Sequence, residues 1–312
     1  MDFRLSEEQQ QFTDSLRRWI ERDYTFEARQ KIVTSPAGVS DAAYANLVEL
    51  GALALAEAAV GRAVLNALAV PEEAGGLGGS SEDLMLVMKE LGRGLVVEPY
   101  FATVLAADFL RRGGHTAVLE SVGSGELKLA SALSEKESGH ELFNIATSAR
   151  KDGDQYVIQG LKCAVIHGGQ AGGFVVSART GCEQRDTDGI SLFYVPRDTA
   201  GVTVTDYRTY DGQRGADVRF DNVRVPASAL IGAVGRGWDI LEASTDYGVA
   251  LLCAEAVGAM ETANALTLEY LKTRKQFGVP IGTFQVLQHR MADMFMHAEQ
   301  AIITSTETDP TR

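Results

Sequence analysis

The sequence predicts an α+β protein in which a β domain separates two helical blocks. Apolar residues recur at helical spacing near the N-terminus, they alternate with other residues in the middle third, and a long proline-free stretch follows. We therefore expect an N-terminal α-helical domain over residues 1–125, a middle antiparallel β barrel or sandwich over 126–232, and a C-terminal α-helical domain over 233–312.

The N-terminal block opens with a helix start signal. Ser6 is placed to cap a helix, and Gln9, three residues on, can complete a capping box. The apolar side chains that follow share one helical face, and they are Phe12, Leu16, Trp19 and Ile20. Glu82–Leu91 predicts a second amphipathic helix, and the glycine-rich run Pro71–Gly79 before it predicts a loop.

The middle third has the pattern of short strands separated by turn residues. Leu129–Leu133 alternates in polarity, and a turn at Asp152-Gly153 joins Ala146–Arg150 to Gln155–Gln159 as a hairpin. Four further strands are expected, at Gly173–Arg179, Ile190–Val195, Val202–Tyr207 and Asp217–Val225.

The C-terminal block is dominated by one long helical stretch. Trp238–Arg274 contains no proline and ends in cations that suit a helix C-terminus. Gly278 and Pro280 end this helix, and Thr283 is expected to cap a last one.

The composition is that of an ordinary globular protein, with 312 residues, 45% hydrophobic and 23% charged. The formal net charge of -13 disfavours a nucleic-acid surface, which needs clustered cations. The cysteines Cys163, Cys182 and Cys253 are far apart, which disfavours a zinc site or a disulfide framework and favours a cytoplasmic location. The longest apolar stretch, Leu50–Val70, is interrupted by polar residues and predicts a packed helix rather than a membrane span.

Four local motifs occur in an order that covers nearly the whole chain. They are the loop Pro71–Gly78, the run Leu133-Ser134-Glu135, the segment Asp211–Arg214 with the strand Val218–Pro226, and Arg274–Ile281 followed by Gln285. Together these motifs resemble those of the acyl-CoA dehydrogenase family. The long helix from Leu252 to Lys275 looks like that of the pimeloyl-CoA dehydrogenase small-subunit type. The resemblance implies FAD as cofactor, an acyl-CoA substrate, an electron-transfer acceptor, and an oligomer with itself or with a large acyl-CoA dehydrogenase subunit.

The resemblance also implies a reaction and a set of site residues. The reaction removes a proton and a hydride from adjacent carbons of an acyl thioester, and the flavin takes the hydride. The matching positions that contact FAD are Leu133, Ser134, Val165 and Ile166 around the flavin ring, and Arg274, Phe277 and Gln285 from across a subunit interface. Two further residues, His140 and Asp246, are expected on the substrate side.

Several positions depart from the family pattern. Ala164 stands where the family usually has an aromatic residue, and Ile166 stands where it has a hydroxyl near the flavin N5. Gly248 occupies one of the family's positions for the catalytic base, so no catalytic residue is assigned. Glu255 lies two turns further along, about 10 Å away on the helix axis, and is expected to be structural or interfacial. The resemblance further implies that the C-terminal helices of the family are missing, which leaves the bundle incomplete, and that Ala52–Ala69 is longer than usual.

Three functions remain open from the sequence. The first is a small subunit that dehydrogenates a medium-chain, dicarboxylic or ring-bearing acyl-CoA on FAD held jointly with a large subunit. The second is a non-catalytic scaffold subunit, which Ala164, Ile166 and Gly248 favour. The third is a flavin monooxygenase on the same fold, to which no individual residue points. His167, a lone histidine near a strand end, is expected to be structural.

Overall fold

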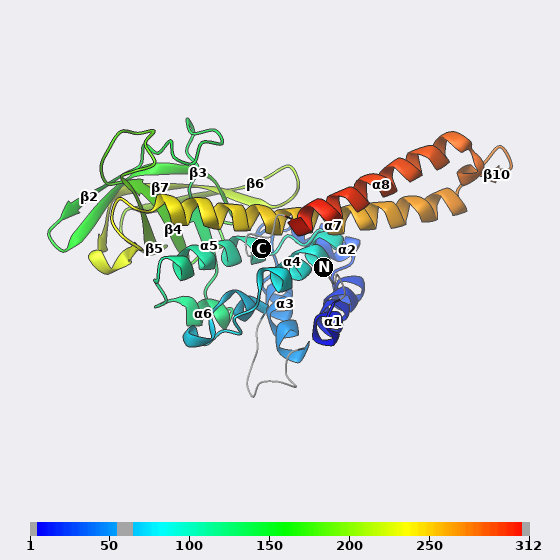
Figure 1. Ribbon diagram of the computed structural model, residues 1–312, viewed down its shortest axis with the longest axis horizontal. Coiled ribbons are helices and arrows are strands. Elements are labelled where there is room, and N and C mark those ends of the chain that lie inside the picture. The colour runs from blue at the N-terminus through cyan, green and yellow to red at the C-terminus, as the bar shows by residue number, and fades with distance from the viewer. Residues whose placement is uncertain (1–4, 55–64, 308–312) are drawn as a thin grey trace. The chain divides into compact units, whose positions relative to one another are not determined.

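The computed structural model describes residues 5–54 and 65–307 of the chain (Figure 1). Within these residues the chain forms two compact units, each discontinuous in sequence. Unit 1 contains residues 5–26, 81–96 and 249–307, and unit 2 contains residues 27–54, 65–80 and 97–248. The boundary at Gly248 falls inside the longest helix, α7 (Trp238–Thr273). The long stretch Ala52–Ala69 and the apolar run Leu50–Val70 lie partly outside the described residues.

Unit 1 is helical apart from a short hairpin. Its elements are α1 (Glu7–Asp23), α4 (Ser81–Arg93), the C-terminal part of α7, the strands β9 (Lys275–Gln276) and β10 (Val279–Pro280), the turn η4 (Ile281–Thr283) and α8 (Gln285–Glu307). The α7 helix ends at Thr273, one residue before the predicted end. By length and composition alone α7 could cross a membrane, a test that core helices of soluble proteins also pass.

The predicted cap of the first helix is confirmed, and that of the last helix is wrong. The Ser6 hydroxyl accepts from the Gln9 backbone N–H at 3.1 Å, and the Ser6 N–H donates to the Gln9 side chain at 3.0 Å. Two backbone donors at the start of α1 are thereby satisfied. Thr283 instead donates its hydroxyl to the Pro280 carbonyl at 2.8 Å, and α8 begins only at Gln285.

Helices α4 and α7 cross at two glycines. A Cβ atom on Gly92 of α4 would overlap the carbonyl oxygen of Glu255, and a Cβ on Gly258 of α7 would overlap that of Lys89. Because neither glycine carries a side chain, the two backbones approach closely enough for Lys89 to pair with Glu261 at 2.8 Å. The carbonyl oxygen of Glu255 lies in this crossing.

Unit 2 combines short helices with the β domain. Its helical elements are α2 (Phe26–Thr34, whose first residue falls in unit 1), α3 (Asp41–Ala54), η1 (Leu65–Ala69), η2 (Glu72–Ala74), α5 (Tyr100–Arg112), α6 (Leu119–Gly123), η3 (Ala227–Ala229) and the first turns of α7. The predicted glycine-rich loop is present as η2 and an irregular segment after it, in which Gly75 and Gly78 have positive φ.

The strands of unit 2 form one eight-stranded sheet with the order β6-β7-β3-β2-β4-β5-β8 and β1 beside β4. The strands are β1 (Leu129–Ala132), β2 (Ser148–Asp152), β3 (Gln155–Ile166), β4 (Gly173–Arg179), β5 (Ile190–Pro196), β6 (Val202–Arg208), β7 (Arg214–Pro226) and β8 (Leu230–Ile231). Every strand proposed from the sequence is present, but β3 continues to Ile166, seven residues beyond the predicted end at Gln159. The β1–β4 pair is parallel, which departs from the antiparallel arrangement that the alternation predicts.

The two faces of the sheet meet different neighbours. On β4, Phe174 and Val176 join a core built from strand residues, whereas Val175 between them joins the core that contains Phe109 and Leu110 of α5. Helix α5 thus covers one face of the sheet (Figure 1). The predicted fold, helices before and after a central β domain, is confirmed.

Candidate functional site

The segment Leu133–Ser134 follows β1, and a buried lysine on β3 holds it in place. Lys162 on β3 is completely buried and donates its ammonium to the Leu133 carbonyl at 2.9 Å. The backbone N–H of Cys163 donates to the Ser134 carbonyl at 2.9 Å. Both carbonyls are therefore occupied by β3, while the Ser134 hydroxyl has no hydrogen bond to the described part of the protein.

The charge of Lys162 is balanced by Glu135, the last residue of the same motif. The ammonium donates to the Glu135 carboxylate at 2.8 Å and to the Ser177 hydroxyl at 3.0 Å. The same carboxylate accepts backbone N–H groups of Ala146 at 2.8 Å and Thr147 at 3.0 Å. Three separate segments, after β1, before β2 and on β3, are thus tied to one carboxylate.

The ionisation of this pair follows from its burial. Burial lowers the pKa of Lys162 to about 8, although the nearby Glu135 carboxylate acts in the opposite direction. Burial also acts to raise the pKa of Glu135, but Lys162 and the backbone donors outweigh it and hold that pKa below its ordinary value. Both groups are therefore charged at neutral pH, and their hydrogen bonds are charge-assisted.

The side chain of Ile166, at the end of β3, is exposed to solvent. The β3–β7 register shifts between Lys162 and Val165, and Ala164 in this irregularity has a positive φ of 53°. The Val165 side chain is buried, whereas Ile166 is 43% exposed. The turn that follows is held by Arg197, whose guanidinium donates to the carbonyls of Gly168, Gly169 and Ala171.

The two histidines have different environments. His167 is 2% exposed, its Nδ1 has no partner among the described residues, and burial lowers its pKa to about 4. An uncharged, buried ring is what the structural role predicted for His167 requires. His140 lies in the turn after β1 and is exposed.

The first turns of α7 carry the residues that match the family's substrate and base positions. Asp246 is exposed, whereas Gly248 is buried against α5, where an added Cβ would lie 3.0 Å from Leu105 and 3.7 Å from Phe101. Glu255 is half-buried further along the helix, in unit 1.

Arg274 and Phe277 lie in the short connection between α7 and α8, and Gln285 directly follows it. Arg274 directly follows α7, and its carbonyl accepts the Ile281 N–H at 2.8 Å, which closes the connection into a hairpin. Phe277 is 91% exposed, and its ring meets Phe284 edge-on at 6.2 Å. Gln285 is the first residue of α8. The three predicted residues are brought together within unit 1.

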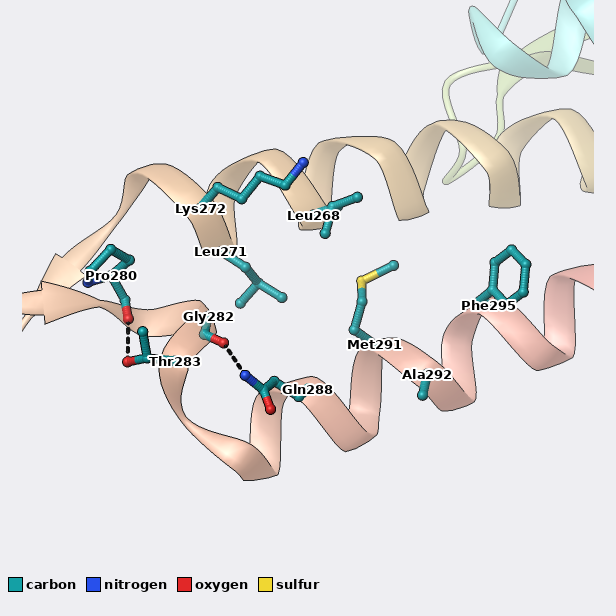
Figure 2. A pocket seen from close by; sticks show the side chains of 10 residues that line it. All are labelled: Leu268, Leu271, Lys272, Pro280, Gly282, Thr283, Gln288, Met291, Ala292 and Phe295. Atoms are coloured by element: carbon teal, nitrogen blue, oxygen red, sulfur yellow. Dashed lines mark hydrogen bonds between the residues drawn. The ribbon is translucent and has the colours of Figure 1, made fainter.

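An apolar groove of about 650 Å³ lies beside this connection (Figure 2). Leu268, Leu271 and Met291 face it from the two helices, and the Gln288 amide closes its end by donating to the Gly282 carbonyl at 2.8 Å. The groove has few polar groups, so it suits an apolar surface better than a phosphate.

Two models of protein families match the chain. The acyl-CoA dehydrogenase middle domain matches residues 130–223, and the acyl-CoA dehydrogenase C-terminal domain matches residues 235–307. The probable acyl-CoA dehydrogenase FadE25 of Mycobacterium tuberculosis is 33% identical over 245 residues, which make up 76% of this chain.

The chain belongs to the acyl-CoA dehydrogenase family. The predicted family is thereby confirmed, and the curated relatives are named as probable acyl-CoA dehydrogenases. The match to FadE25 spans 63% of that relative's length, so the chain corresponds to part of it.

Several solved structures have the same fold. Butyryl-CoA dehydrogenase from Megasphaera elsdenii is 25% identical, with a TM-score of 0.85 over 99% of this chain and 80% of that chain. The FAD complex of PigA is 25% identical, with a TM-score of 0.84 over 98% of this chain and 79% of that chain. The ChsE4–ChsE5 complex of Mycobacterium tuberculosis, at 24% identity, has a TM-score of 0.84 over 99% of this chain and 79% of that chain. Among these proteins, PigA is solved as a complex with FAD.

Proposed function

We propose that the chain is a subunit of an FAD-dependent acyl-CoA dehydrogenase that acts on the adjacent carbons of an acyl thioester. The observation that carries this proposal is the position of the Leu133–Ser134 segment in a chain of this family. Hydrogen bonds from Lys162 and Cys163 hold the segment beside the end of β3. The Ser134 hydroxyl has no hydrogen bond among the described residues, and Ile166 is exposed and apolar. The two suit a flat ring that is polar at one edge and apolar elsewhere, which is the chemistry of flavin.

Each site residue has a specific role in this proposal. Ser134 donates its hydroxyl to the flavin pyrimidine edge, Leu133 offers its backbone there, and Val165 and Ile166 line the ring. Bound FAD supplies the hydride acceptor. Arg274 contacts the FAD pyrophosphate of a neighbouring subunit through its fork of donors, with Phe277 and Gln285 beside it. His140 and Asp246 contact the acyl-CoA.

The partner that we propose is a large acyl-CoA dehydrogenase subunit, as in the small-subunit type linked to pimeloyl-CoA. Apolar side chains exposed on the α7–α8 hairpin support an interface there, and they include Leu266, Tyr270, Val286, Phe295 and Ile303. The likeness to a chain of the ChsE4–ChsE5 complex is consistent with a heteromer. The substrate class is a medium-chain, dicarboxylic or ring-bearing acyl-CoA, and a separate electron acceptor reoxidises the flavin.

We further propose that the protein is cytoplasmic and binds neither nucleic acid nor membrane. Its net charge of -13 opposes binding to a polyanion. Cys163, Cys182 and Cys253 are free, as expected in a reducing compartment. The domain boundaries at 125/126 and 232/233 are likewise proposals.

A second candidate function is a scaffold subunit that completes the FAD site of its partner without chemistry of its own. Gly248 favours it, because this base position lacks a carboxylate and Leu105 leaves little room for one. Mixing the chain with the large subunit and following flavin reduction by acyl-CoA separates the two functions. If acyl-CoA reduces flavin bound to this chain alone, the scaffold function is excluded. If acyl-CoA reduces only flavin in the large subunit's own site, the enzyme function of this chain is excluded.

The FAD site itself is tested by a conservative pair of variants. Ser134→Ala removes one hydrogen bond and should raise the Kd for FAD by about two- to tenfold. Ser148→Ala, at an exposed position of β2, should leave the Kd unchanged. Equal FAD affinity of all three proteins would contradict the placement of the pyrimidine edge at Ser134.

A further inference from the structure

Tyr207, Gly215 and Ile166 lie in one row across three neighbouring strands. Tyr207 on β6 pairs with Gly215 on β7, and Gly215 pairs in turn with Ile166 on β3. Residues paired in this way point to the same face of a sheet, so Tyr207 and Ile166 share a face. The residue between them has no side chain, and the two can therefore approach each other across it.

The ring of Tyr207 occupies the space above Gly215. A Cβ atom on Gly215 would lie 2.9 Å from Cε2 and 3.3 Å from Cζ of the Tyr207 ring. The ring therefore leans from the edge strand toward the centre of the sheet, over the glycine and toward β3. Any larger residue at position 215 would push it away.

The hydroxyl of Tyr207 is held at its far end. It donates to the Asp217 carboxylate at 3.4 Å, and the backbone N–H of Ala164 donates to the same oxygen at 3.4 Å. Burial and the Asp217 charge raise the pKa of Tyr207, which keeps it a neutral donor at physiological pH. The Tyr207 ring thus packs over Gly215, and its hydroxyl is held by the Asp217 carboxylate.

The upper side of this ring is open. Tyr207 is 36% exposed and Ile166 is 43% exposed, and Ala164, two residues before Ile166 on β3, is also exposed. Together Ala164, Ile166 and Tyr207 form an apolar shelf, a name we use for these three residues only. Tyr210, three residues on, is 109% exposed, so its ring is free where that of Tyr207 is held.

We propose that Tyr207 contacts the flavin ring. In the apolar shelf it supplies the aromatic surface, since Ala164 supplies only a methyl group. This inference rests on the proposed FAD site at Ser134 and Ile166. A flat aromatic side chain beside a flat ring gains more than its buried area alone would give. Tyr207 lies on β6, whereas Ala164 lies on β3. The Tyr207 ring can extend across β7 toward Ile166 because residue 215 on β7 is a glycine.

The test is FAD titration of the protein and of three variants, followed by flavin fluorescence, with the large subunit added if the chain alone binds none. Tyrosine in contact with an excited flavin quenches its emission by electron transfer, whereas phenylalanine does not. Tyr207→Phe should keep the Kd for FAD and raise the emission of bound flavin. Tyr207→Leu should also raise the Kd by about two- to tenfold, because the aromatic contact is lost. Tyr210→Phe, the matched control, should change neither quantity.

Each outcome decides between the two proposals. If FAD binds and the emission of Tyr207→Phe equals that of the unchanged protein, the shelf is overturned while the FAD site stands. If neither the chain nor its complex with the large subunit binds FAD, both proposals fail. Thermal unfolding of Tyr207→Phe shows whether the ring's packing has been preserved, and its midpoint should match that of Tyr210→Phe.

Discussion

The Lys162 ammonium lies 2.8 Å from the Glu135 carboxylate, and the lysine is completely buried. The cost of burying these two charges is offset only while both are present, since each is the other's counter-ion. The pair also holds the Leu133 carbonyl, so the geometry of the candidate flavin segment depends on it.

Removing the lysine alone should therefore destabilise the protein strongly. Lys162→Met leaves Glu135 buried without a cation, and we expect a loss of about 3–5 kcal/mol in the free energy of unfolding. Urea unfolding at neutral pH measures it. The double variant Lys162→Met/Glu135→Gln should recover part of the loss, and Lys151→Met on exposed β2 should be neutral. If Lys162→Met is as stable as Lys151→Met, the pair has no structural role.

Acid should destabilise the protein through His167. Burial lowers its pKa to about 4 from an ordinary value of about 6.5, so the unfolded chain takes up the proton first as the pH falls. Stability is therefore lost between about pH 6.5 and pH 4, by up to about 3 kcal/mol from this residue. Asn tolerates the positive φ of this position.

The variant His167→Asn should flatten that part of the curve of unfolding free energy against pH, measured by denaturant titration. His140→Asn, at an exposed position, should leave the curve unchanged. A curve for His167→Asn that runs parallel to that of the unchanged protein would assign the acid sensitivity to other groups.

The crossing of α4 and α7 should not tolerate a methyl group. Gly258→Ala would place a Cβ atom against the Lys89 carbonyl, so the helices must separate, and we expect a loss of about 1–3 kcal/mol. Gly123→Ala in α6 is the matched control, because its new Cβ would lie 3.7 Å from Val70, an ordinary contact. Thermal unfolding of both variants checks this, and equal midpoints would contradict the close crossing.

Much of the fold is readable from local patterns. The capping box at Ser6 and the ends of α7 follow from rules that act within a few residues. Tyr100–Arg112 falls inside the predicted helical domain, but the bounds of α5 are harder to predict because most of its residues are buried and no wide polar face marks the helical period. The parallel β1–β4 pair depends on a chain crossover, which local alternation does not encode.

The candidate site is less readable because its contacts are distant in sequence. The resemblance points to Leu133 and Ser134, but not to Lys162, which fixes them from 29 positions along the chain. A lysine within the apolar end of a strand, Leu161–Ile166, is the available signal. Tyr207 left no such signal, since its place beside Ile166 depends on the register of three strands and on Gly215 between them.

Arg274 should contribute to FAD binding in the assembled protein. Arg274→Gln removes a charge-assisted contact to phosphate, and we expect the Kd for FAD to rise by about ten- to a hundredfold. Lys275→Gln is the control, since this neighbouring cation is also exposed. Titration of FAD into the oligomer measures both variants, and equal affinities would place the pyrophosphate elsewhere.

The most direct test of the proposed function is the visible absorbance of the FAD-bound protein, with its large subunit, on addition of acyl-CoA without oxygen. The panel comprises medium-chain, dicarboxylic and ring-bearing thioesters. We expect at least one of them to bleach the oxidised flavin spectrum, because the flavin accepts the substrate's hydride. An oxidised spectrum that no acyl-CoA changes would contradict the assignment as an acyl-CoA dehydrogenase.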